Sequence, residues 1–220
     1  MFNINRTSIE SAAKSANAKI DKGSSSSDVF DIFKLSVCNI IEIQSELSKY
    51  DMCHWINHID RWISNNARNN SISYGRGTIV NVDLGAQNYK HEPSYLHPCI
   101  ILCESRYSAL VVPCSSKQYG KGYIGVIDAE VSDGFSVKTG VQMQAYRWIH
   151  KNRIISSVGH VNGSLLDKID KEMLSTIPSY KLEIAKLNAD IAKKQAEIDK
   201  LQNEIETLNK KLAEIQDTNN

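Results

Sequence analysis

Two histidines in the N-terminal third of the chain have a spacing that suits a metal ion. His54 and His58 are four residues apart on a predicted helix, so their imidazoles would share one face, and Cys53 precedes the first of them. The pattern lacks the glutamate of an H-E-x-x-H motif and offers no clear third ligand. The competing interpretation is a pair of partly exposed helix histidines. We therefore expect no metal site and no cofactor.

The cysteines and the overall charge limit the class of protein. Five cysteines, an odd number without a C-x-x-C pair, favour free and mostly buried thiols in a reducing cytoplasm. The formal net charge is only +1, so there is no global signature of nucleic-acid binding, and any RNA site must be local. No secretory signal pattern is seen at the start. No apolar run reaches the roughly 20 residues that span a membrane.

Hydrophobic periodicity predicts a helical region over residues 27–70. The preceding segment, 1–26, ends in a serine run and is expected to be flexible. From Asp28 onward apolar residues recur at steps of three and four, and a second apolar face runs from Asp51 to Asn65. Helices this short do not persist alone. They must pack against each other, the following domain or a second subunit.

Short apolar runs separated by Gly, Pro and Ser turns predict a small β barrel between residues 74 and 177, closed by a helix after Gly163. The run 98–104 is apolar on both faces, which indicates a central strand covered on both sides. The long polar loop 86–96 is expected to be functional. The other predicted strands are 79–84, 109–114, 123–127, 152–158 and, as the longest, 139–149.

A heptad repeat predicts a coiled coil over residues 179–218. β-Branched residues at position a with Leu at position d favour a parallel two-stranded coiled coil, so we expect a homodimer. Lys194 is the one misfit in the seam. The alternative is a long arm that folds back on the helices at 28–65. Position a holds Ile184, Ile191, Ile198, Ile205 and Leu212, and position d holds Leu187, Lys194, Leu201, Leu208 and Ile215.

Three motifs follow one another in the segment 74–176, and their order resembles the MazF/PemK/Kid family of bacterial toxins. The family has a His-Glu or Ser-Glu loop before Arg-Pro, then a hydroxyl residue after Val-Val-Pro, then an acidic residue before Arg-Thr-Ile-Asp and a basic pair. The corresponding residues are His91-Glu92 with His97-Pro98, then Val111-Val112-Pro113-Cys114-Ser115-Ser116, then Gln144 with Arg147-Trp148-Ile149-His150 and Asn152-Arg153-Ile154.

The resemblance implies an α+β fold with an SH3-like barrel, here with an N-terminal helical region and a C-terminal coiled-coil helix added. It also implies a cytoplasmic endoribonuclease toxin of a type II toxin–antitoxin system, bound by a cognate antitoxin protein. The implied reaction is metal-independent cleavage of single-stranded RNA, in which the ribose 2′-hydroxyl attacks the adjacent phosphate. Such a reaction needs proton-transfer groups and donors around the phosphate.

Carried over position by position, the resemblance assigns catalysis to His97, Ser115 and Arg147. His97 stands where the family has Arg, so we expect better proton transfer and a weaker grip on phosphate. Ser115 would hydrogen-bond to the phosphate, and Arg147 would supply charge. The competing interpretations are structural. His97 would be a turn residue before a proline, Ser115 would cap the end of a strand, and Arg147 would form an ion pair with Glu92 or Asp83. The substrate-binding residues implied are Glu92, Ser116, Lys117 and Gln144.

Departures from the family leave other functions open. If the loss of the family's Arg and acidic residue abolishes cleavage, the domain would be an RNA- or protein-binding module on a coiled-coil oligomer. A third possibility is a structural or regulatory oligomer whose working part is the coiled coil. The N-terminal helices could also cover the RNA groove in cis and mimic an antitoxin.

Overall fold

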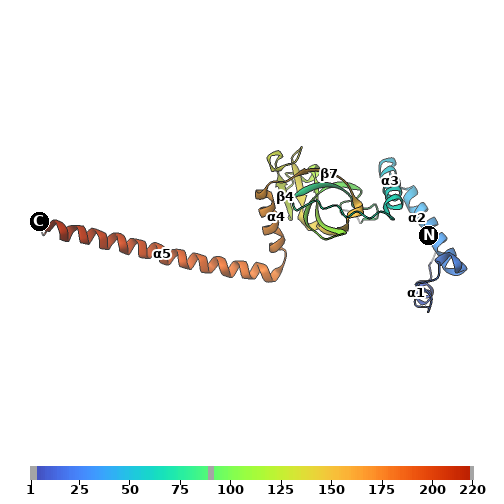
Figure 1. The fold of residues 1–220 in the computed structure, drawn as a ribbon, viewed down its shortest axis with the longest axis horizontal. Helices are drawn as coiled ribbons and strands as arrows, with labels where there is room; N and C mark the ends of the chain where they lie inside the picture. The colour runs from blue at the N-terminus through green and yellow to red at the C-terminus, as the bar shows by residue number, and fades with distance from the viewer. Residues whose placement is uncertain (1–3, 89–91, 219–220) are drawn as a thin grey trace. The chain divides into compact units, whose positions relative to one another are not determined.

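The structure, a computed structural model, describes residues 4–88 and 92–218, with side chains described up to residue 211. The chain divides into two compact units. The first contains the residues up to Asn69 together with Asp83–Leu96, and the second contains Asn70–Val82 together with the residues from His97 onward. Figure 1 shows the order of the elements along the chain.

The first unit is helical. It contains α1 (Arg6–Ala13), α2 (Ser27–Ser45) and α3 (Lys49–Asn65), with a 3-10 turn η1 (Gly23–Ser25) between the first two. The two helices predicted from periodicity are therefore confirmed, and α1 lies within the segment 1–26. The hydroxyl of Ser48 caps α3 by accepting a hydrogen bond from the Asp51 amide at 3.1 Å.

The second unit contains one antiparallel sheet. Its strand order is β4-β5-β3-β2-β1-β7, and β6 pairs with β3 beside β5. Among the described residues no ladder joins β4 to β7, so the α+β class is confirmed while a closed SH3-like barrel stays a prediction. The strands are β1 (Thr78–Asp83), β2 (Leu96–Glu104), β3 (Ser108–Ser115), β4 (Val126–Ala129), β5 (Thr139–Gln142), β6 (Arg147–His150) and β7 (Ile154–His160).

The predicted long strand over 139–149 is wrong. A 3-10 turn, η4 (Met143–Ala145), divides it into β5 and β6. The reason lies in β3, whose one edge pairs with β5 at Cys114 and with β6 at Val111. The chain must leave the sheet between these two pairings, and it buries Met143 as it does so. The predicted strand 123–127 also begins later, at β4.

The core confirms that β2 is covered on both sides. Its residues from Cys99 to Leu102 are all buried. The helix α4 (Gly163–Ser175) lies beside the strands in Figure 1 and buries Leu165 and Ile169 completely. The core cluster consists of Ile79, Ile100, Leu102, Val112, Cys114, Ala129, Phe135, Val141, Met143, Val161, Leu165 and Ile169.

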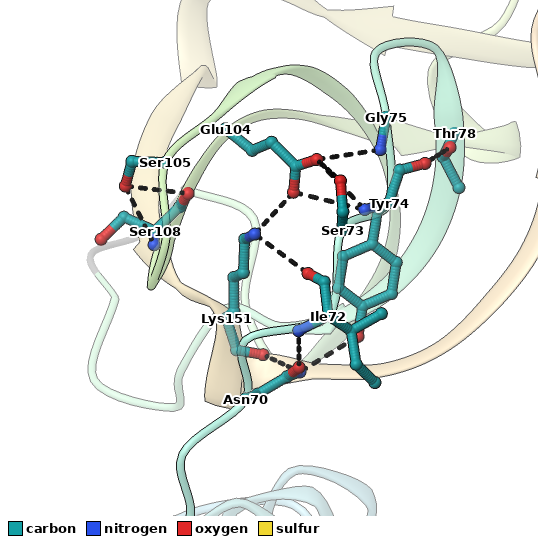
Figure 2. Close-up of polar contacts among 10 residues, drawn as sticks. All are labelled: Asn70, Ile72, Ser73, Tyr74, Gly75, Thr78, Glu104, Ser105, Ser108 and Lys151. Atoms are coloured by element: carbon teal, nitrogen blue, oxygen red, sulfur yellow. Dashed lines mark hydrogen bonds and ion pairs between the residues drawn. The ribbon is translucent and has the colours of Figure 1, made fainter.

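A buried ion pair joins the end of β2 to the turn that follows β6. The Lys151 side chain is 2% exposed, and its ammonium lies 2.6 Å from a carboxylate oxygen of Glu104. Figure 2 shows the same ammonium directed at the backbone carbonyl of Ile72, to which it donates at 3.0 Å. Lys151 belongs to the turn η5 (Lys151–Arg153), which follows β6 directly. We call this arrangement the Lys151–Glu104 clamp.

The clamp fixes the chain before β1. The Glu104 carboxylate accepts hydrogen bonds from the hydroxyl of Ser73 at 2.6 Å and from the amides of Tyr74 and Gly75. Burial alone would raise the pKa of Glu104, but the hydrogen bonds from Lys151, Ser73 and the two amides lower it to about 2. The carboxylate therefore stays ionised throughout the neutral range.

The last element is α5 (Pro178–Thr218), 41 residues long. Pro178 occupies its first position, where a missing amide hydrogen costs nothing. The heptad residues from Leu187 to Leu208 that the structure describes are exposed in the single chain. The long helix is thus confirmed, and its pairing into a coiled coil stays a prediction. No helix in the described part of the chain is long and apolar enough to cross a membrane.

Candidate functional site

The pairing of β2 with β3 brings two of the predicted catalytic residues to one end of the sheet. Cys99 lies opposite Pro113 in this antiparallel ladder. His97 is two residues before Cys99, and Ser115 is two residues after Pro113. Since side chains alternate between faces with a period of two, His97 and Ser115 project from the same face. His97 is half-buried near the start of β2, and Ser115 is half-buried at the end of β3.

Arg147 joins this face from the next strand. It is the first residue of β6 and lies opposite Val111 in β3. Val111 and Ser115 share a face and are about 13 Å apart along β3. The half-buried Arg147 side chain donates from Nε to the carbonyl of Ala145 at 3.5 Å. Burial raises the pKa of the Cys99 thiol strongly, and the positive charge of Arg147 acts in the opposite direction.

The three residues offer complementary chemistry. An imidazole can accept and return a proton, a hydroxyl can donate a hydrogen bond, and a guanidinium carries a permanent charge with several donors. Cys99 lies on the same face and Cys114 on the opposite one, and burial raises the pKa of both thiols and keeps them protonated. The arrangement suits a reaction at a phosphate rather than a thiol chemistry.

Two predicted substrate-binding residues follow Ser115 directly. Ser116 and Lys117 are exposed and lie in the 3-10 turn η2 (Ser116–Gln118). This turn is packed against β5, because a Cβ placed on Gly140 would approach the backbone carbon of Gln118 to 2.8 Å. The close approach fixes the turn at the same end of the sheet as Ser115.

The other predicted binding residues lie outside the strand ladders. Gln144 is exposed in η4, and its amide oxygen packs over Gly125, which has a left-handed backbone with φ of 75°. Glu92 is exposed and belongs to the first unit. His91 of the same motif lies outside the described residues. The sheet therefore brings His97, Ser115 and Arg147 to one face, whereas Gln144 lies in the turn between β5 and β6.

The first unit contains a charged cluster that sequence reasoning missed. A ring nitrogen of His58 lies 2.9 Å from one carboxylate oxygen of Asp83, and Arg61 donates to the other oxygen at 2.6 Å. Burial alone would raise the pKa of Asp83, but the hydrogen bonds from Arg61 and His58 lower it. The spacing of His58 and Arg61 on one helix face was visible in the sequence, but their partner 22 to 25 residues later was not.

This cluster corrects one sequence interpretation. His58 is buried rather than partly exposed, and it pairs with Asp83. His54 packs its ring on Tyr95 at a centroid distance of 5.1 Å. In the part of the chain that the structure describes, no group of three or more His, Cys, Asp or Glu is placed to hold a metal ion.

A comparison with protein families agrees with the motifs. Residues 75–176 match the sequence model of PemK-like, MazF-like toxins of type II toxin–antitoxin systems. No curated protein gives a significant match to the chain. The matched segment runs from just before β1 to the end of α4, so it contains the whole sheet and leaves α1, α2, α3 and α5 outside. The resemblance inferred from the sequence is thereby confirmed for residues 75–176, which are similar to PemK-like, MazF-like toxins.

Proposed function

We propose that the chain is an endoribonuclease toxin that cleaves single-stranded RNA without a metal ion. The family match to residues 75–176 supports the class of protein. The observation that carries the reaction is the shared face of His97, Ser115 and Arg147, which follows from the ladders of β2, β3 and β6. These residues supply the three kinds of group that phosphate attack by a 2′-hydroxyl requires.

In the proposed reaction the imidazole of His97 accepts the proton of the ribose 2′-hydroxyl. The 2′ oxygen forms a bond to phosphorus, and the bond from phosphorus to the leaving 5′ oxygen breaks. The imidazolium then returns the proton to the 5′ oxygen, which leaves a 2′,3′-cyclic phosphate and a free 5′-hydroxyl. Ser115 and Arg147 stabilise the negative charge on the phosphate.

The remaining predicted residues would bind the substrate around this centre. Lys117 and Ser116 extend the donor surface beyond Ser115, and an exposed ammonium suits a flanking phosphate. Gln144 can read a base edge through its amide, which both donates and accepts hydrogen bonds. Glu92 would contact the substrate from its loop.

The test is the cleavage of a long single-stranded RNA by the purified full chain in EDTA. We expect fragments that end in a 2′,3′-cyclic phosphate, and no cutting at a site where the ribose is replaced by 2′-deoxyribose. If the folded chain, free of other proteins, leaves the RNA intact, the enzyme proposal fails. The presence of His97 in place of the family's Arg would then favour the RNA- or protein-binding module.

We propose that the partners are a cognate antitoxin and a second copy of the chain. The second copy would pair through the exposed heptad residues of α5, and the unpaired cysteines suit the cytoplasm. The closed SH3-like barrel and the in-cis covering of the RNA groove belong to the same proposal. Removal of residues 1–69, which keeps Asn70 and its bond to the Lys151 carbonyl, should then raise the cleavage rate, and an unchanged rate would count against the covering role.

Sedimentation equilibrium tests the self-association. The full chain should sediment as a dimer, because isoleucine and leucine at positions a and d stabilise a parallel coil. Lys194→Leu should strengthen the dimer, since it removes the one charged residue from the seam, while Lys193→Leu outside the seam should not. A chain without residues 179–220 should lose the coil but keep RNA cleavage. A monomeric full chain at micromolar concentration would contradict the coiled coil.

A further inference from the structure

The second face of β6 carries side chains that the proposed reaction does not use. Trp148 lies opposite Leu110 in the β3–β6 ladder, and His150 lies opposite Ser108. Both therefore project away from the face of Arg147. Trp148 is 57% exposed although it is the largest apolar side chain of the strand. One exposed ring is ordinary, so the case for a ligand depends on the side chains that lie beside it.

The turn between β2 and β3 adds two more side chains beside His150. The ring of Tyr107 lies parallel to that of His150, with planes 2° apart and centroids separated by 6.4 Å. The guanidinium of Arg106 lies 5.0 Å from the centroid of the Tyr107 ring. The backbone carbonyl of Tyr107 accepts a hydrogen bond from the Lys151 amide at 2.8 Å, which holds this turn against the end of β6. We call Arg106, Tyr107, Trp148 and His150 the aromatic strip.

We propose that the aromatic strip binds unpaired bases of the RNA by stacking, next to the phosphate held at Arg147. The proposal rests on the proposed function, because it takes the same RNA as ligand. Aromatic rings and the guanidinium plane are the side chains on which single-stranded bases stack, and such stacking tolerates any base. The strip contributes ring faces and one permanent positive charge, and none of its four side chains is acidic.

The position of the strip suits a strand that passes over β6. Within the described residues β6 pairs with β3 alone, so its other edge carries no neighbouring strand. Arg147 and Trp148 are consecutive and project to opposite faces of β6. A phosphate at Arg147 would leave a neighbouring base free to turn over this edge and stack on Trp148. Many RNA-binding proteins gain affinity from a strongly basic surface. This chain is nearly neutral, so stacking would supply affinity that its charge does not.

The experiment measures binding of a fluorescein-labelled 2′-O-methyl oligonucleotide of mixed sequence to the full chain. The 2′-O-methyl group blocks the attacking oxygen, so binding is measured without cleavage. We expect Trp148→Ala to weaken binding roughly 5- to 150-fold, the loss that removal of one stacked base produces. Trp148→Phe, which keeps a ring, should retain most of the affinity. Trp62→Ala is the matched control, because Trp62 is also 57% exposed but lies on α3.

A second readout separates stacking from charge. In the variant Trp55→Phe/Trp62→Phe the tryptophan fluorescence comes from Trp148 alone. The oligonucleotide should quench this fluorescence, and an abasic strand of the same length should not. Equal affinity of wild type and Trp148→Ala, or equal quenching by the abasic strand, would overturn the stacking site. The same holds if the wild type fails to bind the oligonucleotide. Binding that depends on Trp148 without any RNA cleavage would instead contradict the proposed function alone.

Discussion

Replacement of Lys151 by Met is expected to lower the free energy of unfolding by about 3–5 kcal/mol. The substitution keeps an unbranched side chain of similar length but removes the ammonium. It leaves the Glu104 carboxylate, whose side chain is only 17% exposed, without its cation. It also removes the donor to the Ile72 carbonyl. The change would be measured by urea unfolding of the full chain, followed by the far-ultraviolet circular dichroism of the sheet domain.

An exposed ion pair provides the control for this prediction. Lys138 lies 3.1 Å from Glu130, and both side chains are about half exposed. Lys138→Met should leave the free energy of unfolding nearly unchanged, because water screens the pair. The double substitution Lys151→Met/Glu104→Gln should recover part of the loss, since it no longer leaves a buried charge alone. Equal effects of the substitutions at Lys151 and Lys138 would show that the clamp is not a buried pair.

The clamp also predicts the response to acid. The pKa of Glu104 falls from 4.5 to about 2 on folding, so the unfolded chain binds this proton more readily. The stability that Glu104 contributes is therefore complete above about pH 4.5 and is lost as the pH falls toward 2. A profile of unfolding free energy against pH should fall in this window for the wild type and fall less for Glu104→Gln.

Replacement of His97 by Ala is expected to slow RNA cleavage by about 100- to 10,000-fold, the range for loss of a general acid or base. Ser115 and Arg147 remain on the same face of the sheet, so the phosphate should still be bound. The loss should therefore fall mainly on the turnover rate and not on the affinity for the 2′-O-methyl oligonucleotide. Single-turnover cleavage and fluorescence anisotropy measure the two quantities separately.

Two further variants keep this prediction specific. His54→Ala, which removes a half-buried histidine of α3, should cleave RNA at the wild-type rate. His97→Arg restores the family's residue, and it should bind RNA more tightly because a guanidinium grips phosphate with two donors. Unchanged cleavage by a folded His97→Ala chain would remove the imidazole from the mechanism and leave His97 as a turn residue before Pro98.

Local patterns were enough to predict α2, α3, α4, α5 and most of the strands, but not α1, which lies in the segment expected to be flexible. The apolar periodicity from Asp28 to Asn65 predicted α2 and α3, and the doubly apolar run predicted the buried centre of β2. The division of 139–149 could not be predicted in this way. Apolar residues continue through Met143, and what ends the strand is the change of partner along β3. The pairing of strands that are distant in the sequence cannot be read from the residues of one strand alone.

The candidate site depends on the same kind of pairing. The order of the motifs proposes His97, Ser115 and Arg147, but their common face follows only from the register Cys99↔Pro113 and Val111↔Arg147. The charged pairs were missed altogether. Lys151 and Glu104 are polar residues that usually lie in solvent, and only the closed tertiary structure buries them together.

The Lys151–Glu104 clamp determines the N-terminal boundary at which the sheet domain can be separated from the preceding helices. The family match begins at residue 75, but Asn70, Ile72 and Ser73 already bond to the sheet domain, with Asn70 donating to the carbonyl of Lys151 at 2.9 Å. A fragment that starts at residue 75 would lack Ile72, whose carbonyl accepts a hydrogen bond from the buried ammonium of Lys151 (Figure 2). The ammonium would then be exposed to water. Gene fusions and protease nicks should be tolerated before Asn70 and harmful just after it.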